Sequence, residues 1–92
     1  MRAVNQKEAL VPLYMDVHTV EGATEEDVAK AHAADLKTQE PHGVRYLKYW
    51  VDEKAGKIFC LVDAPSAEAA ETVHREAHGL VAEEIYEVTE HT

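Results

Sequence analysis

Residues 44–63 read VRYLKYWVDEKAGKIFCLVD, two apolar segments joined by a short polar loop that ends at Gly56. Aromatic and β-branched residues are frequent in both segments, and a short loop with a glycine between two such segments is typical of a β-hairpin. Residues 57–63 carry apolar side chains on both faces, which is the pattern of a central strand covered on two sides. The sequence therefore predicts a hairpin at the middle of a sheet.

The segment before the hairpin predicts a strand followed by a helix. Residues 13–18 alternate strictly, as in a half-buried strand. Thr24 is expected to begin a helix, because Asp27 three residues later completes a pattern that resembles a capping box. The helix should end near Gln39, ahead of Pro41. Its expected inner stripe consists of Val28, Ala29, His32 and Leu36.

The segment after the hairpin repeats this order in reverse. Ser66 is a helix cap, Gly79 is a natural left-handed end, and residues 84–89 alternate as a last strand. Strand, helix, strand, strand, helix, strand is the ferredoxin-like βαββαβ order of an α+β domain. We expect a four-stranded antiparallel sheet with two helices on one face, formed by a single domain over residues 11–92.

The charge and composition exclude several classes of partner. Acidic side chains outnumber basic ones by 18 to 9, and the net charge of -9 repels phosphate backbones and anionic lipid surfaces. No apolar run approaches the roughly 18 residues of a membrane span. The single Cys60 cannot form an internal disulfide. Residues 1–10 contain no long apolar core and no cleavage signal, so we expect a cytoplasmic protein in which they form an N-terminal tail.

A domain of 92 residues buries only about two thirds of its unfolded surface and gains stability from a partner subunit. With both helices on one sheet face, the other face would stay open, and an exposed apolar face usually marks an interface. We therefore expect a homodimer formed sheet against sheet. Strict alternation places the following residues on that open face: Tyr14, His18, Tyr46, Trp50, Phe59 and Leu61.

Two histidines four residues apart, His74 and His78, fall on one face of the second helix. Neutral imidazoles at this spacing form half a site for nickel, copper or zinc, and Glu71 one turn earlier could supply a carboxylate. Arg75 stands where a zinc protease helix has its catalytic glutamate, so that class is excluded. In the alternative interpretation, His78 only complements the helix dipole beside the capping Gly79.

Two further histidines each have an aspartate nearby. His32 lies in the expected apolar stripe with Asp35 three residues on, so its ring must be hydrogen-bonded, bound to metal or facing a cavity. His18 shares a strand face with Asp16, and this pair could chelate or could close the polar end of a dimer contact. Cys60 is expected to be buried as a small hydrophobe, although its thiolate would be a strong ligand.

Five segments together resemble a small bacterial family of nickel-binding proteins that was first described as a domain of unknown function. These segments are Tyr14–His18, Ala31–Leu36, Gly43–Trp50, Cys60–Pro65 and Val73–Leu80. The characterised member of that family is a nickel-binding protein from a streptomycete. The resemblance implies a ferredoxin-like dimer that takes up nickel.

The main hypothesis is therefore a homodimeric nickel-binding protein that serves sequestration or handling of the metal, with copper or zinc as other ions for the same donors. Its affinity should fall as the pH drops through roughly 6.5, because only neutral imidazoles bind. The candidate ligands and supporting carboxylates are His74, His78, His32, His18, Asp16, Asp35 and Glu71.

Two alternatives remain open from the residues. Dimeric ferredoxin-like scaffolds also host small oxygenases and isomerases, and here His32 and Asp35 would be the acid and base in an aromatic-lined pocket. An apolar cavity opening onto His32 would favour such an enzyme, whereas histidines converging at the surface would favour the metal site. The second alternative is an assembly module whose histidines have no function.

Overall fold

The computed structural model describes residues 12–92, and the expected tail over residues 1–10 lies outside this range. A short 3-10 helix, η1, is the only element that the sequence did not predict within it. The elements are β1 (Leu13–Thr19), α2 (Glu25–Thr38), η1 (Glu40–His42), β2 (Arg45–Asp52), β3 (Lys57–Asp63), α3 (Ala67–Ala77) and β4 (Glu84–Val88).

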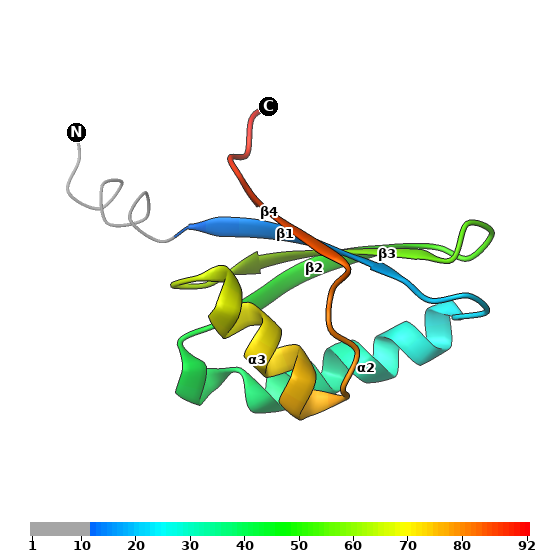
Figure 1. The fold of residues 1–92 in the computed structure, drawn as a ribbon, viewed down its shortest axis with the longest axis horizontal. Coiled ribbons are helices and arrows are strands. Elements are labelled where there is room, and N and C mark those ends of the chain that lie inside the picture. The colour runs from blue at the N-terminus through cyan, green and yellow to red at the C-terminus, as the bar shows by residue number, and fades with distance from the viewer. Residues whose placement is uncertain (1–11) are drawn as a thin grey trace.

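The strands form one antiparallel sheet in the order β2-β3-β1-β4. Both long helices lie under the same face of the sheet, and no helix covers the opposite face in the described part of the chain (Figure 1). The hairpin places β3 beside β1 in the interior of the sheet, as its two apolar faces predicted. The ferredoxin-like α+β prediction is confirmed.

The predicted helix boundaries follow from caps that the structure contains. The Thr24 side chain accepts a hydrogen bond from the Asp27 amide, and the Asp27 carboxylate accepts one from the Thr24 amide, which completes a capping box. The Ser66 side chain accepts a hydrogen bond from the Ala69 amide at the start of α3. Gly79 follows α3 with a φ of 82°, a conformation that glycine adopts without steric cost. Local sequence therefore determines where both helices begin.

The expected face assignment was wrong for β1. Asp16 is fully buried and His18 is 3% exposed, because both lie on the face that the helices cover. The strand register confirms this, since Asp16 pairs with Cys60 and His18 with Ile58, and both partners belong to the buried core. Tyr14, also expected on the open face, packs against this same core. Alternation alone identified the two faces of β1 but not which of them meets the helices.

A register shift also moved Tyr46 away from its expected face. Tyr46 pairs with Val62, yet Lys48 pairs with Leu61, so Leu47 is an extra residue in β2. The Tyr46 side chain is only 4% exposed and lies in the core beneath the sheet. The bulge thus places the Tyr46 hydroxyl among the histidines.

The expected inner stripe of α2 was wrong at two positions. Val28 and Asp35 are buried, whereas Ala29 is exposed and Leu36 is 46% exposed. Burial of a carboxylate is unfavourable unless it is hydrogen-bonded, and Asp35 has histidine partners on α3. These contacts rotate α2 so that Asp35 rather than Leu36 faces inward.

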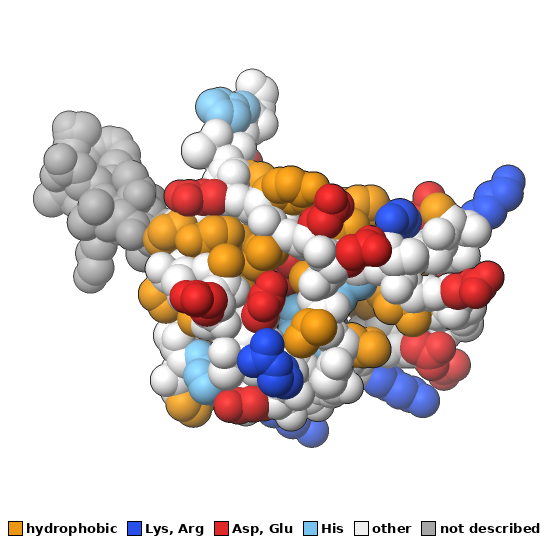
Figure 2. Space-filling model, in the orientation of Figure 1, with side chains coloured by type: hydrophobic (Ala, Val, Ile, Leu, Met, Phe, Trp, Pro, Cys, Tyr) orange, Lys and Arg blue, Asp and Glu red, His pale blue; other side chains and the backbone are white. Residues whose placement is uncertain are grey.

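The open sheet face carries apolar side chains from β2 and β3. Trp50, Phe59 and Leu61 lie there as expected, because Trp50 pairs with Phe59 in the row that also contains Val17. Trp50 is 48% exposed. Figure 2 shows hydrophobic side chains at the surface along the sheet layer.

No helix within residues 12–92 is both long and apolar enough to cross a membrane.

Candidate metal centre

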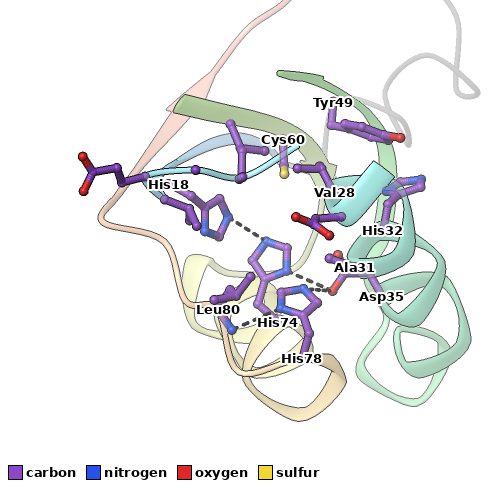
Figure 3. Close-up of a pocket in the computed structure, with 16 residues that line it drawn as sticks. His18, Val28, Ala31, His32, Asp35, Tyr49, Cys60, His74, His78 and Leu80 are labelled. Atoms are coloured by element: carbon purple, nitrogen blue, oxygen red, sulfur yellow. Dashed lines mark hydrogen bonds and ion pairs between the residues drawn. The ribbon is translucent and has the colours of Figure 1, made fainter. Parts of the chain in front are cut away.

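His74 occupies the centre of a buried polar cluster between the sheet and the helices (Figure 3). It comes from the last turn of α3 and is 1% exposed. Its Nδ1 atom lies 2.9 Å from Asp35 Oδ1 on α2, and its Nε2 atom lies 3.0 Å from Asp16 Oδ2 on β1. The ring is thus held between two carboxylates from different elements.

The Nε2 atoms of His74 and His18 and the Asp16 carboxylate converge on one point. His18 Nε2 lies 3.2 Å from His74 Nε2 and 3.0 Å from Asp16 Oδ1. Nitrogens bound to one ion at about 2.0–2.1 Å stand roughly 2.9–3.4 Å apart in tetrahedral or octahedral geometry. The two imidazoles and the Asp16 carboxylate therefore have the spacing of ligands that share one cation.

Cys60 and Tyr46 surround the Asp16 carboxylate. The Cys60 sulfur belongs to the same group of donor atoms as Asp16, His18 and His74. Burial, reinforced by the nearby Asp16, raises the pKa of the Cys60 thiol well above its usual range, so the sulfur is protonated. The Tyr46 hydroxyl lies 3.0 Å from Asp16 Oδ2, to which it donates, and 3.1 Å from the Ala70 carbonyl oxygen. Sequence reasoning missed Tyr46, because the bulge in β2 has no signal in the amino-acid pattern.

The electrostatics of the cluster favour separated charges. Burial opposes ionisation of Asp16, but hydrogen bonds from His18 and His74 hold the pKa of its carboxyl well below its usual range. Burial likewise opposes ionisation of Asp35, and the neighbouring His74 and His78 rings lower its pKa. Burial disfavours the charged form of His74, yet hydrogen bonds to Asp16 and Asp35 raise its pKa to about 9. At neutral pH the Asp16 and Asp35 carboxylates thus flank the His74 imidazolium.

His78 lies beside the cluster, and its ring is hydrogen-bonded to the backbone of Leu80. Its Nδ1 atom accepts a hydrogen bond of 3.1 Å from the Leu80 amide, so in the neutral ring the proton sits on Nε2. That Nε2 atom is buried 3.0 Å from Asp35 Oδ1 and makes no hydrogen bond within the described residues. A protonated nitrogen offers no lone pair to a metal. His78 can therefore act as a ligand only by giving up its bond to Leu80.

Two residues proposed from the sequence lie outside the converging donors. His32 packs against the Tyr49 ring with centroids 4.7 Å apart, and burial lowers its pKa despite the nearby Asp35. Two groups of potential metal ligands lie within residues 12–92, one made of Asp16, His18, Cys60 and His74 and the other of Asp35, His74 and His78. Glu71 belongs to neither group. The Asp35 carboxylate contacts His74 and His78 through Oδ1, and no hydrogen bond joins it to His32 within the described residues.

A cavity of about 270 Å³ opens beside the cluster. His32 and Tyr49 line one wall, and His18, His74 and Cys60 contribute to its inner end. A cavity that opens onto His32 was expected for an enzyme, and such a cavity is present. Converging histidines were expected for a metal site, and they do converge, although in the interior rather than at the surface. Ligands of small size can reach the buried cluster through this space.

The fold and the cluster define a ferredoxin-like α+β domain with a buried set of imidazole and carboxylate donors suited to a divalent transition metal. Residues 14–88 match the family described as "Nickel responsive protein SCO4226-like", and the chain belongs to this family. It is similar to a protein of known crystal structure, SCO4226 from Streptomyces coelicolor A3(2), at 40% sequence identity and a TM-score of 0.81. The match covers 87% of this chain and 99% of that one. No curated protein matches the chain.

Proposed function

We propose that this protein binds a divalent nickel ion through Asp16, His18 and His74, and that it serves sequestration or handling of the metal. The observation that carries this proposal is the 3.2 Å separation of the two Nε2 atoms beside the Asp16 carboxylate. Two N–H groups that point toward the same carboxylate at this separation repel each other. A cation bound by both lone pairs removes that repulsion.

Charge balance supports a divalent ion. The metal-free cluster contains the Asp16 and Asp35 carboxylates and the protonated His74 ring. A divalent ion that displaces the His74 Nε2 proton, with the His18 proton moving from Nε2 to Nδ1, leaves two negative and two positive charges. Buried charge is costly unless it is paired, so this exchange favours the bound state.

Asp35 would act as a positioning residue for the site. It accepts the Nδ1–H of His74, which leaves the Nε2 lone pair directed at Asp16 and His18. Carboxylates bonded in this way fix the tautomer and the orientation of histidine ligands in many metal sites. The Cys60 thiol could join the coordination only after losing its proton.

The choice of nickel rests on the family, because copper and zinc also bind imidazole and carboxylate donors. The words "nickel responsive" describe the family that the chain matches, and they support nickel over the other two metals. The cavity next to His18 and His74 leaves room for waters to complete the larger coordination number that nickel accepts.

Elemental analysis and calorimetric titration of tag-free protein test this function. We expect His74→Ala to abolish nickel uptake, whereas His42→Ala should retain it, because His42 pairs with Glu76 at the surface. We expect His78→Ala to retain binding as well, because its Nδ1 is occupied by the Leu80 amide. Uptake by the His74→Ala variant at the affinity of the unaltered protein would disprove the site.

We also propose that two copies associate through their open sheet faces. Trp50, Phe59 and Leu61 are apolar side chains on that face, and a surface of this kind can pair with itself about a twofold axis. The size of the domain supports such an arrangement, because small domains gain stability by burying more apolar surface.

The enzyme alternative has less support from the geometry. It requires Asp35 to polarise His32, but Asp35 is hydrogen-bonded to His74 and no hydrogen bond joins it to His32 in the described part of the chain. The cavity that His32 lines could still bind a small ligand.

A further inference from the structure

We propose that the cavity beside the metal cluster binds a compact aromatic amine, with the ring between the apolar walls and the ammonium group at the acidic mouth. This binding goes beyond nickel handling and requires no metal. The cavity volume is about 270 Å³. An apolar cavity of about 150 Å³ accommodates benzene, and drug-sized ligands occupy about 300 Å³ or more. The space therefore suits a single substituted ring.

The walls provide the apolar surface that a ring requires. Val28 and Ala31 from α2 and Ile58 from β3 line the cavity, and Tyr49 from β2 adds an aromatic face. The Tyr49 ring packs against the imidazole of His32 at a centroid distance of 4.7 Å and an interplanar angle of 42°. Aromatic faces of this kind attract cations as well as other rings.

The charges around the cavity select the sign of the ligand. Glu21 and Asp27 line it and are exposed to solvent, so they stand at its mouth, and Asp35 lies deeper. None of the residues that line the cavity in the described chain is lysine or arginine. An anionic ligand would meet these carboxylates without a matching cation at the mouth, whereas an ammonium group would be attracted there.

Three ligands with the same ring separate these contributions. Benzylamine is cationic at pH 7, benzyl alcohol is neutral and benzoate is anionic. Each is titrated into metal-free protein, dialysed against EDTA, while amide chemical shifts are recorded by NMR. We expect saturable shifts around the cavity with benzylamine, weaker ones with benzyl alcohol and none with benzoate. Equal or tighter binding of benzoate would overturn the proposal.

Matched variants on one helix test the location. Ala31→Leu fills the cavity and should abolish benzylamine binding, whereas Ala29→Leu on the exposed side of α2 should leave it unchanged. Both substitutions place a good helix former in a helix, and circular dichroism reports whether each variant folds. Binding of benzylamine to folded Ala31→Leu at unaltered affinity would place the ligand elsewhere and overturn the proposal.

A charge variant tests the mouth without affecting the core. Glu21→Gln should weaken benzylamine binding by about two- to five-fold, as expected for a partly exposed ion pair, and should leave benzyl alcohol unaffected. The control is Glu26→Gln, an exposed residue on α2 outside the cavity. Equal effects of the two variants would contradict a specific ammonium position. Because no metal is present in these titrations, their failure leaves the nickel proposal intact.

Discussion

The two nitrogens of His74 face two aspartates, with Nδ1 2.9 Å from Asp35 Oδ1 and Nε2 3.0 Å from Asp16 Oδ2. One aspartate comes from a helix and the other from a central strand, so the ring joins the two layers of the domain. This arrangement gives His74 both a structural role, as a buried cation, and a proposed role as a metal ligand.

Removing the Asp35 charge should weaken nickel binding without removing a ligand. We expect Asp35→Asn to lower the nickel affinity about 10- to 100-fold, because an amide holds the His74 Nδ1–H less strongly than a carboxylate does. Calorimetric titration measures this change. Glu71→Gln is the control, since Glu71 lies outside both donor groups in the described chain. If the two variants lost affinity equally, Asp35 would have no special role.

The stability of the metal-free protein should depend on the charge of His74. Its pKa is raised from 6.5 to about 9 on folding, so its contribution is complete below about pH 6.5 and is lost as the pH rises through 9. We therefore expect a higher melting temperature at pH 6.5 than at pH 9.5, measured by circular dichroism in the presence of EDTA. In a His74→Gln variant that difference should shrink, and an unchanged difference would assign it to other groups.

The Tyr46 hydroxyl should stabilise the fold through Asp16. Tyr46→Phe removes the donor and leaves a buried carboxylate with one hydrogen bond fewer, which we expect to cost about 1–3 kcal/mol of unfolding free energy. Urea denaturation measures the change. The half-exposed Tyr86 provides a control, and Tyr86→Phe should change stability by less than about 0.5 kcal/mol. Similar values for the two variants would argue against the buried hydrogen bond.

A charge on the open sheet face should separate the proposed dimer. Trp50 is 48% exposed in the single chain, and a glutamate in its place would carry an unpaired charge into the interface. We expect Trp50→Glu to be a monomer by light scattering, while Lys54→Glu in the exposed β2–β3 loop remains a dimer. A monomeric unaltered protein at micromolar concentration would remove the dimer proposal.

Local signals in the sequence were sufficient for the elements and their order. The Thr24 and Ser66 caps, the β2–β3 hairpin and the alternation in β1 each depend on neighbouring residues, and each is present in the structure. These features led to the ferredoxin-like order, because six elements in that sequence leave few ways to cover one sheet.

The facing of β1 and α2 could not be predicted in the same way. Hydrophobic patterns assign polar side chains to the outside, yet Asp16, His18 and Asp35 are among the most buried residues. Their burial is favourable only because they meet one another across the layers. A pattern within one element contains no information about partners on another.

The amino-acid sequence by itself determined the two long helices, the four strands, their order and the set of residues able to bind a metal. The tertiary structure alone decided which of them converge, because ligand atoms must lie about 3 Å apart and that spacing depends on how α3 packs against β1. His74 and His78 share a helix face. The imidazole nitrogen that lies 3.2 Å from His74 Nε2, however, belongs to His18 on β1.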